Sequence, residues 1–63
     1  MFQGDKVQVV AGRLRQGLQH LTGKIDKVVR ESGKVCATFV DGFGDEREEA
    51  SFLFEPAELQ VVK

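Results

Sequence analysis

Short segments in which polar and apolar residues alternate recur along the whole chain, separated by glycines and one proline. Such alternation predicts β-strands with one buried face. No segment of ten residues carries the 3.6-residue apolar repeat of an amphipathic helix. Five strands are therefore expected, over residues 5–10, 21–29, 34–40, 50–54 and 59–62.

The segment between the first two expected strands, residues 11–19, contains two glycines and no sustained period, which predicts a long mobile loop. A short helix over residues 14–21 is the alternative, because Leu14, Leu18 and Leu21 have helical spacing. Gly17 would cost that helix about 1 kcal/mol. In the second strand, Gly23 predicts a bend or β-bulge near the strand's start.

Three turns complete the pattern. Residues 31–33 predict a hairpin turn, and residues 55–59 predict one turn of helix with Pro56 at its first position. Residues 41–45 form the remaining turn, in which we expect Gly42 or Gly44 to adopt a positive φ. Phe43, between these glycines, is then presented to solvent or to a partner.

These elements predict an all-β fold, a single domain over residues 1–63. We expect a five-stranded antiparallel barrel with a long first loop and a short helical turn before the last strand. The apolar positions of the strands should form its core: Val7, Val9, Ile25, Val29, Val35, Ala37, Phe39, Phe52, Phe54 and Leu59.

Three segments carry a resemblance to known proteins: Gly4–Val9, Leu21–Ile25 and Phe54–Leu59. Their order resembles that of SH3-like small barrels, and the first two are similar to the KOW motif, in which Gly-x-hydrophobic opens the second strand. The whole order also resembles small subunits of photosynthetic complexes, such as the ferredoxin-docking subunit of photosystem I and a ferredoxin-binding subunit of the chloroplast-type NADH dehydrogenase complex. That likeness implies an SH3-like fold and, for the photosynthetic group, ferredoxin as an acidic partner.

The amino-acid composition limits which catalytic and metal-binding sites the chain could form. The chain has 63 residues, 41% of them hydrophobic, with one Cys and one His. His20 and Cys36 are thus the only nucleophile–base pair, and a mid-strand cysteine is expected to be a packing residue. A zinc site, a calcium loop and a phosphate-binding loop all lack their residues or spacing. We expect no enzyme activity, no metal and no cofactor. With no apolar run longer than three residues and no secretory signal, we expect a cytoplasmic protein without a membrane segment.

Charge is distributed unevenly along the chain. Residues 1–40 hold seven Lys/Arg and three Asp/Glu, a balance of +4, whereas residues 41–63 hold two and seven, a balance of −5. The basic side chains of the first part could line one side of the barrel. The other interpretation is two ordinary solvated faces of mixed charge.

The function expected from these features is a non-catalytic protein-binding or complex-assembly module that docks by charge complementarity. The alternative is a KOW-like module that binds RNA or a ribonucleoprotein, which the absence of Trp and Tyr and the net charge of −1 disfavour. A third hypothesis is an enzyme whose cleft forms only in an oligomer. The candidate partner-binding residues are Arg13, Leu14, Arg15, Lys24, Lys27 and Phe43.

Overall fold

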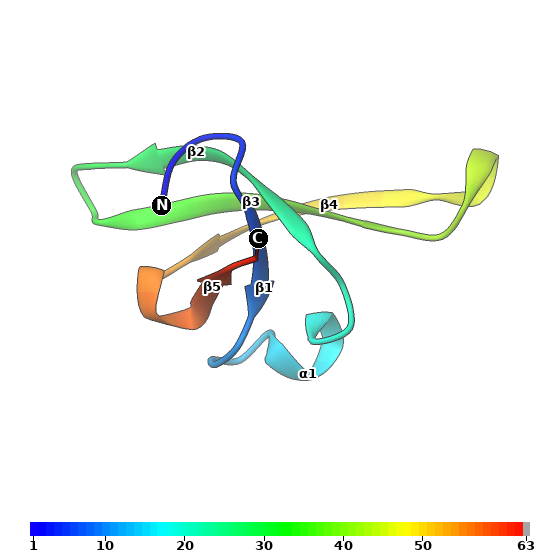
Figure 1. Ribbon diagram of the computed structural model, residues 1–63, viewed down its shortest axis with the longest axis horizontal. Helices are drawn as coiled ribbons and strands as arrows, with labels where there is room; N and C mark the ends of the chain where they lie inside the picture. The colour runs from blue at the N-terminus through cyan, green and yellow to red at the C-terminus, as the bar shows by residue number, and fades with distance from the viewer. Residues whose placement is uncertain (63) are drawn as a thin grey trace.

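The computed structural model describes residues 1–62 and has the predicted all-β architecture (Figure 1). Five antiparallel strands form one sheet in the order β4-β3-β2-β1-β5. A four-residue helix and two 3-10 turns connect them. The elements are β1 (Lys6–Val9), α1 (Arg15–Leu18), β2 (Gly23–Val29), β3 (Lys34–Asp41), η1 (Gly44–Glu46), β4 (Glu48–Phe54), η2 (Pro56–Glu58) and β5 (Leu59–Val61).

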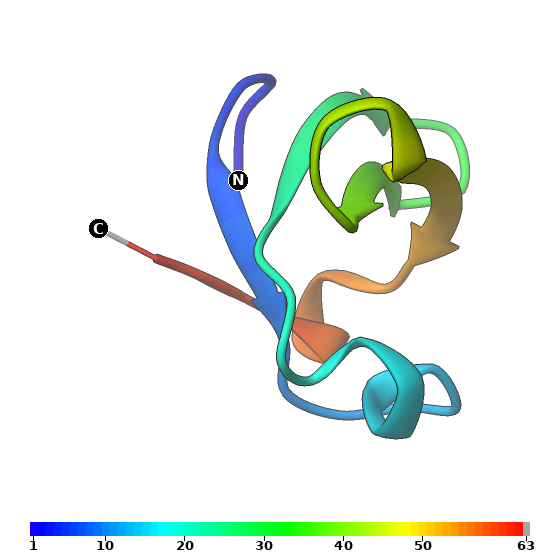
Figure 2. The ribbon, with the colours of Figure 1, turned by 90° about the vertical axis from the view of Figure 1, so that its right-hand side faces the viewer.

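The sheet bends around its interior because β1 and β2 are paired over only two positions. Val7 lies opposite Gly23 and Lys6 opposite Lys24, after which β2 continues along β3 and β1 continues along β5. The bend brings η2 and the loop that holds α1 to one side of the sheet, as the two views agree (Figures 1 and 2). This arrangement has the long first loop and the helical turn before the last strand that the sequence predicts.

The core is formed by one face of the strands, and eight of its ten predicted members are buried. Phe39 and Phe54 meet edge to face, with ring centroids 5.8 Å apart, and Phe52 packs against Phe54 from a half-buried position. Met1, Leu14, Leu18 and Leu21 pack around this cluster. The fully buried residues are Val7, Val9, Ile25, Val35, Ala37, Phe39, Phe54 and Leu59.

Val29 is not a member of the core cluster, so this prediction was wrong. The register of β2 against β3 shifts between Ile25 and Lys27, which makes Asp26 a bulge residue. A bulge inserts one residue and moves every later side chain to the other face. Val28 therefore lies opposite the buried Val35 but is itself 40% exposed, and Val29, opposite the exposed Lys34, is half-buried, so neither valine joins the core.

Gly23 is not the bulge that the sequence predicts, but it has a packing role. It is buried in regular strand pairing with Phe39, and a Cβ built on it would lie 2.7 Å from the Phe39 ring. No real side chain fits at that distance. Glycine lets the aromatic ring pack directly on the backbone of the neighbouring strand.

The loop before β2 contains a helical turn, α1, where we predicted a loop without structure. Leu18 donates its backbone N–H to the Leu14 carbonyl at 3.1 Å, and both side chains are half-buried against the core. The helical alternative was therefore correct for one turn only, Arg15–Leu18. The start of the loop is fixed to η2, because the N–H groups of Val10 and Ala11 both donate to the Glu58 carbonyl.

Candidate functional site

The hairpin of β3 and β4 extends well beyond the rest of the sheet. The pairing of β2 with β3 ends at Gly23 and Phe39, whereas β3 and β4 stay paired as far as Asp41 and Glu48. Every residue from 40 to 51 is exposed. We call residues 40–49 the acidic arm. It projects along the long axis of a molecule that measures 36 × 21 × 21 Å (Figure 1).

The tip of the acidic arm displays Phe43. Gly42 and Gly44 both have positive φ values, 98° and 59°, which confirms the prediction for this turn. A Cβ on Gly42 would lie 3.0 Å from the Glu46 carbonyl oxygen, so a larger residue would strain the turn. The Phe43 carbonyl accepts the Glu46 N–H at 3.2 Å, which closes η1 behind it. Phe43 is 93% exposed as a result.

Carboxylates surround this phenylalanine. Between residues 40 and 49 there are five acidic side chains and one basic side chain, Arg47, a balance of −4. Two of the acids, Asp41 and Glu48, lie directly opposite each other on neighbouring strands. The negative charge of the second part of the chain is thus concentrated on an element that points away from the core. The acidic side chains are Asp41, Asp45, Glu46, Glu48 and Glu49.

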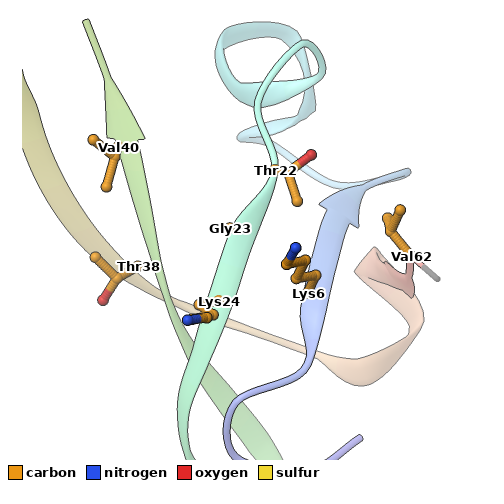
Figure 3. Close-up of a pocket in the computed structure, with 7 residues that line it drawn as sticks. All are labelled: Lys6, Thr22, Gly23, Lys24, Thr38, Val40 and Val62. Carbon is orange, nitrogen blue, oxygen red and sulfur yellow. The ribbon is translucent and has the colours of Figure 1, made fainter. Parts of the chain in front are cut away.

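A hollow of about 540 Å³ lies on the outer face of the sheet (Figure 3). Lys6 and Lys24, which are cross-strand neighbours, stand over it from β1 and β2. The Val62 N–H donates to the Lys6 carbonyl at 2.8 Å, and this bond brings Val62 to the β1 side of the hollow. We call this hollow the outer groove. Its lining residues are Lys6, Thr22, Gly23, Lys24, Thr38, Val40 and Val62.

A row of hydrogen-bonded side chains on three strands borders the outer groove. The Thr38 hydroxyl donates to the carboxylate of Asp26, the bulge residue of β2. Thr38 and Ser51 also share a hydrogen bond of 2.7 Å between β3 and β4. Because the Thr38 proton is given to Asp26, the Ser51 hydroxyl is the donor in this second bond. The sequence does not reveal this row, since its three members belong to three separate strands.

The predicted basic anchors lie elsewhere, in the loop before β2. Arg13 and Arg15 are exposed around a polar depression of about 380 Å³ that Gly12, Gln16 and Gln19 also line. Leu14 is half-buried against the core instead of being displayed. In both ribbon views this loop lies apart from the tip of the acidic arm (Figures 1 and 2). The structure thus does not gather the arginines and Phe43 into one site.

The remaining candidates are also separate from one another. Lys24 belongs to the outer groove, whereas Lys27 is an exposed residue of β2 opposite Cys36. Cys36 is half-buried in β3 and outside the core cluster. His20 is exposed.

Among residues 1–62, no group of three His, Cys, Asp or Glu side chains is arranged to hold a metal ion. Over the same residues, no helix is long and apolar enough to cross a membrane.

Comparison of this chain with protein-family models, with curated protein sequences and with solved structures finds no match. Function must therefore be argued from the arm, the groove and the loop themselves.

Proposed function

We propose that this domain is a non-catalytic protein-binding or complex-assembly module that docks a partner by charge complementarity. The observation that supports this proposal best is Phe43, 93% exposed at the tip of an arm with a charge balance of −4. Phe43 contributes nothing to the core and is held outward by Gly42 and Gly44. Its ring is therefore free to insert into an apolar pocket of a partner. The partner is a protein surface with basic side chains around an apolar hollow.

Within the arm, Phe43 and the carboxylates would have different roles in binding. Aromatic residues are enriched in the centre of protein interfaces, where their burial supplies most of the binding free energy. Charges at the rim act mainly on the rate of association and on its salt dependence. The carboxylates of the arm would steer it towards a basic surface, and Phe43 would hold it there.

The KOW-like alternative is an RNA-binding function of the loop that holds Arg13 and Arg15. Its support is the polar depression formed by these arginines with Gln16 and Gln19, which offers donors to phosphate and sugar oxygens. Two features oppose it. The side chains that line this depression include no aromatic ring on which a base could stack. The acidic arm would also repel a phosphate backbone.

The test compares two variants of the isolated domain, Phe43→Ala and the double reversal Arg13→Glu with Arg15→Glu. Each is immobilised and exposed to nuclease-treated extract of the native cells, and each is titrated with single- and double-stranded RNA and DNA at near-physiological salt. We expect protein capture that survives nuclease and is lost with Phe43→Ala. Nucleic acid should bind with a dissociation constant of about 10⁻⁴ M or weaker. Tight RNA binding that the arginine reversal abolishes would contradict the proposal and establish the alternative.

A further inference from the structure

Two pairs of like charges face each other across neighbouring strands of this sheet. Lys6 lies opposite Lys24 in the outer groove, and Asp41 lies opposite Glu48 in the acidic arm. All four side chains are exposed. Like charges in directly opposite positions of an antiparallel pair destabilise the sheet. The two pairs are of opposite sign, so contact between one pair and the other would relieve both repulsions.

The outer groove also has room for an aromatic ring, because it is an open hollow of about 540 Å³. Val40 and Val62 stand at its two sides, with the backbone of Gly23 between them (Figure 3). An apolar hollow flanked by two ammonium groups fits a ring flanked by carboxylates. Phe43 and its acidic neighbours are such a group.

We propose that the tip of the acidic arm of one copy of this chain docks in the outer groove of a second copy. Phe43 enters between Val40 and Val62, and the Asp41–Glu48 pair lies against the Lys6–Lys24 pair. This inference rests on the proposed function, for which it names the partner. The contact is made between copies because the arm runs away from its own groove, leaving Phe43 with 93% of its surface exposed.

The contact joins two different surfaces, the arm tip and the groove. If each arm reaches the other's groove, the two contacts form one isologous interface of a two-fold dimer; otherwise the contact is heterologous and continues into a ring or a chain. One tip in one groove is a small interface, which predicts weak and reversible association. Because exposed charges supply much of the attraction, rising salt should weaken it.

Sedimentation velocity on the purified chain, from about 10 µM to about 1 mM at low and at high salt, tests this inference. The wild-type protein should show an average mass that rises with concentration and falls with salt. Phe43→Ala should remain monomeric, as should the double reversal Lys6→Glu with Lys24→Glu. Circular dichroism of each variant verifies that it is folded.

Mixing these two non-associating variants gives the sharpest result. Phe43→Ala retains an intact groove and the lysine reversal retains an intact tip, so together they should form a complex that neither forms alone. In NMR spectra of labelled Phe43→Ala, addition of the unlabelled lysine variant should shift the signals of Thr38 and Val40. The matched control reverses Arg30 and Lys34, which changes net charge equally at the turn between β2 and β3, and this variant should associate like the wild type.

Contrary results are equally definite. A wild-type chain that is monomeric at all concentrations and salts would overturn self-docking, as would association that persists in Phe43→Ala. If the chain does not self-associate but captures another protein from extract in a Phe43-dependent manner, this inference fails and the proposed function remains. If the chain neither self-associates nor captures another protein in a Phe43-dependent manner, both this inference and the proposed function fail.

Discussion

Two phenylalanines four residues apart in one hairpin have opposite environments. Phe39, in the part of β3 that pairs with both β2 and β4, is 2% exposed and has Gly23 packed against its ring. Phe43, in the arm where only β3 and β4 pair, is 93% exposed. Phe39 is covered by Gly23 of β2 and by the ring of Phe54, whereas Phe43 lies in the hairpin tip, beyond the point where β2 and β3 stop pairing. Beyond Phe39, where its pairing with β2 stops, β3 no longer contributes to the core and supports the displayed side chain of Phe43.

The core strands and the acidic arm also differ in charge. Outside the arm, the strands carry four lysines and one acidic residue, Asp26, whereas the acidic arm has five acids and one base. Net repulsion of this kind would weaken a compact region, but it costs little on an extended hairpin in water. The arm can therefore be charged for recognition without destabilising the core. The predictions that follow test this separation of folding from binding.

The largest effect is expected from Phe39→Ala. Removal of this ring leaves a cavity beside Phe54 and above Gly23, which should lower the free energy of unfolding by about 3–5 kcal/mol. Small domains are stable by little more than about 5 kcal/mol in total, so the variant should retain about 2 kcal/mol or less and melt well below the wild type. Thermal and urea unfolding followed by circular dichroism measure the change. An unchanged melting curve would show that Phe39 is not a core residue.

A smaller effect is expected from Gly23→Ala, which places a methyl group where the Phe39 ring lies. Overpacking of this kind should cost about 1–3 kcal/mol. Gly17→Ala is the matched control, because its new Cβ meets nothing within 4 Å and its φ is not positive. In the α1 turn that change should be neutral or stabilising by up to about 1 kcal/mol. Equal unfolding midpoints for the two variants in urea would contradict the close packing of Gly23 on Phe39.

The smallest effect on stability is expected from Phe43→Ala. A side chain that is 93% exposed has little burial to lose, so the free energy of unfolding should change by no more than about 0.5 kcal/mol. The same variant should lose partner binding. A loss of stability comparable to that of Phe39→Ala would mean that the arm folds onto the core.

Much of this division could be predicted from the sequence. Alternation placed all five strands and eight buried core residues, because each strand buries one face only. The two glycines that flank Phe43 predicted its display, since a turn with positive φ at both positions points the residue between them outward. These features depend on local patterns, which a single sequence contains.

Other features could not be predicted because they depend on contacts between distant segments. The bulge at Asp26, which moves Val29 out of the core, is visible only in the register of β2 against β3. The outer groove depends on the pairing of β1 with β2, which places Lys6 opposite Lys24. The length of the acidic arm depends on where the pairing of β2 with β3 stops, at Gly23 and Phe39. Glu48 and Glu49 extend β4 by pairing with β3 although they bury nothing, so no apolar pattern marks them as strand.

Removal of the arm tests most directly whether folding and binding are separate. Val40 and Glu49 lie opposite each other, so residues 41–48 can be replaced by an Asn-Gly hairpin turn that connects them. We predict that the shortened chain retains its free energy of unfolding in urea to within about 1 kcal/mol, because loop shortening changes closure entropy only slightly. A loss of about 3 kcal/mol or more, the size of a missing core side chain, would show that the arm is part of the folded core and contradict its assignment as a docking element.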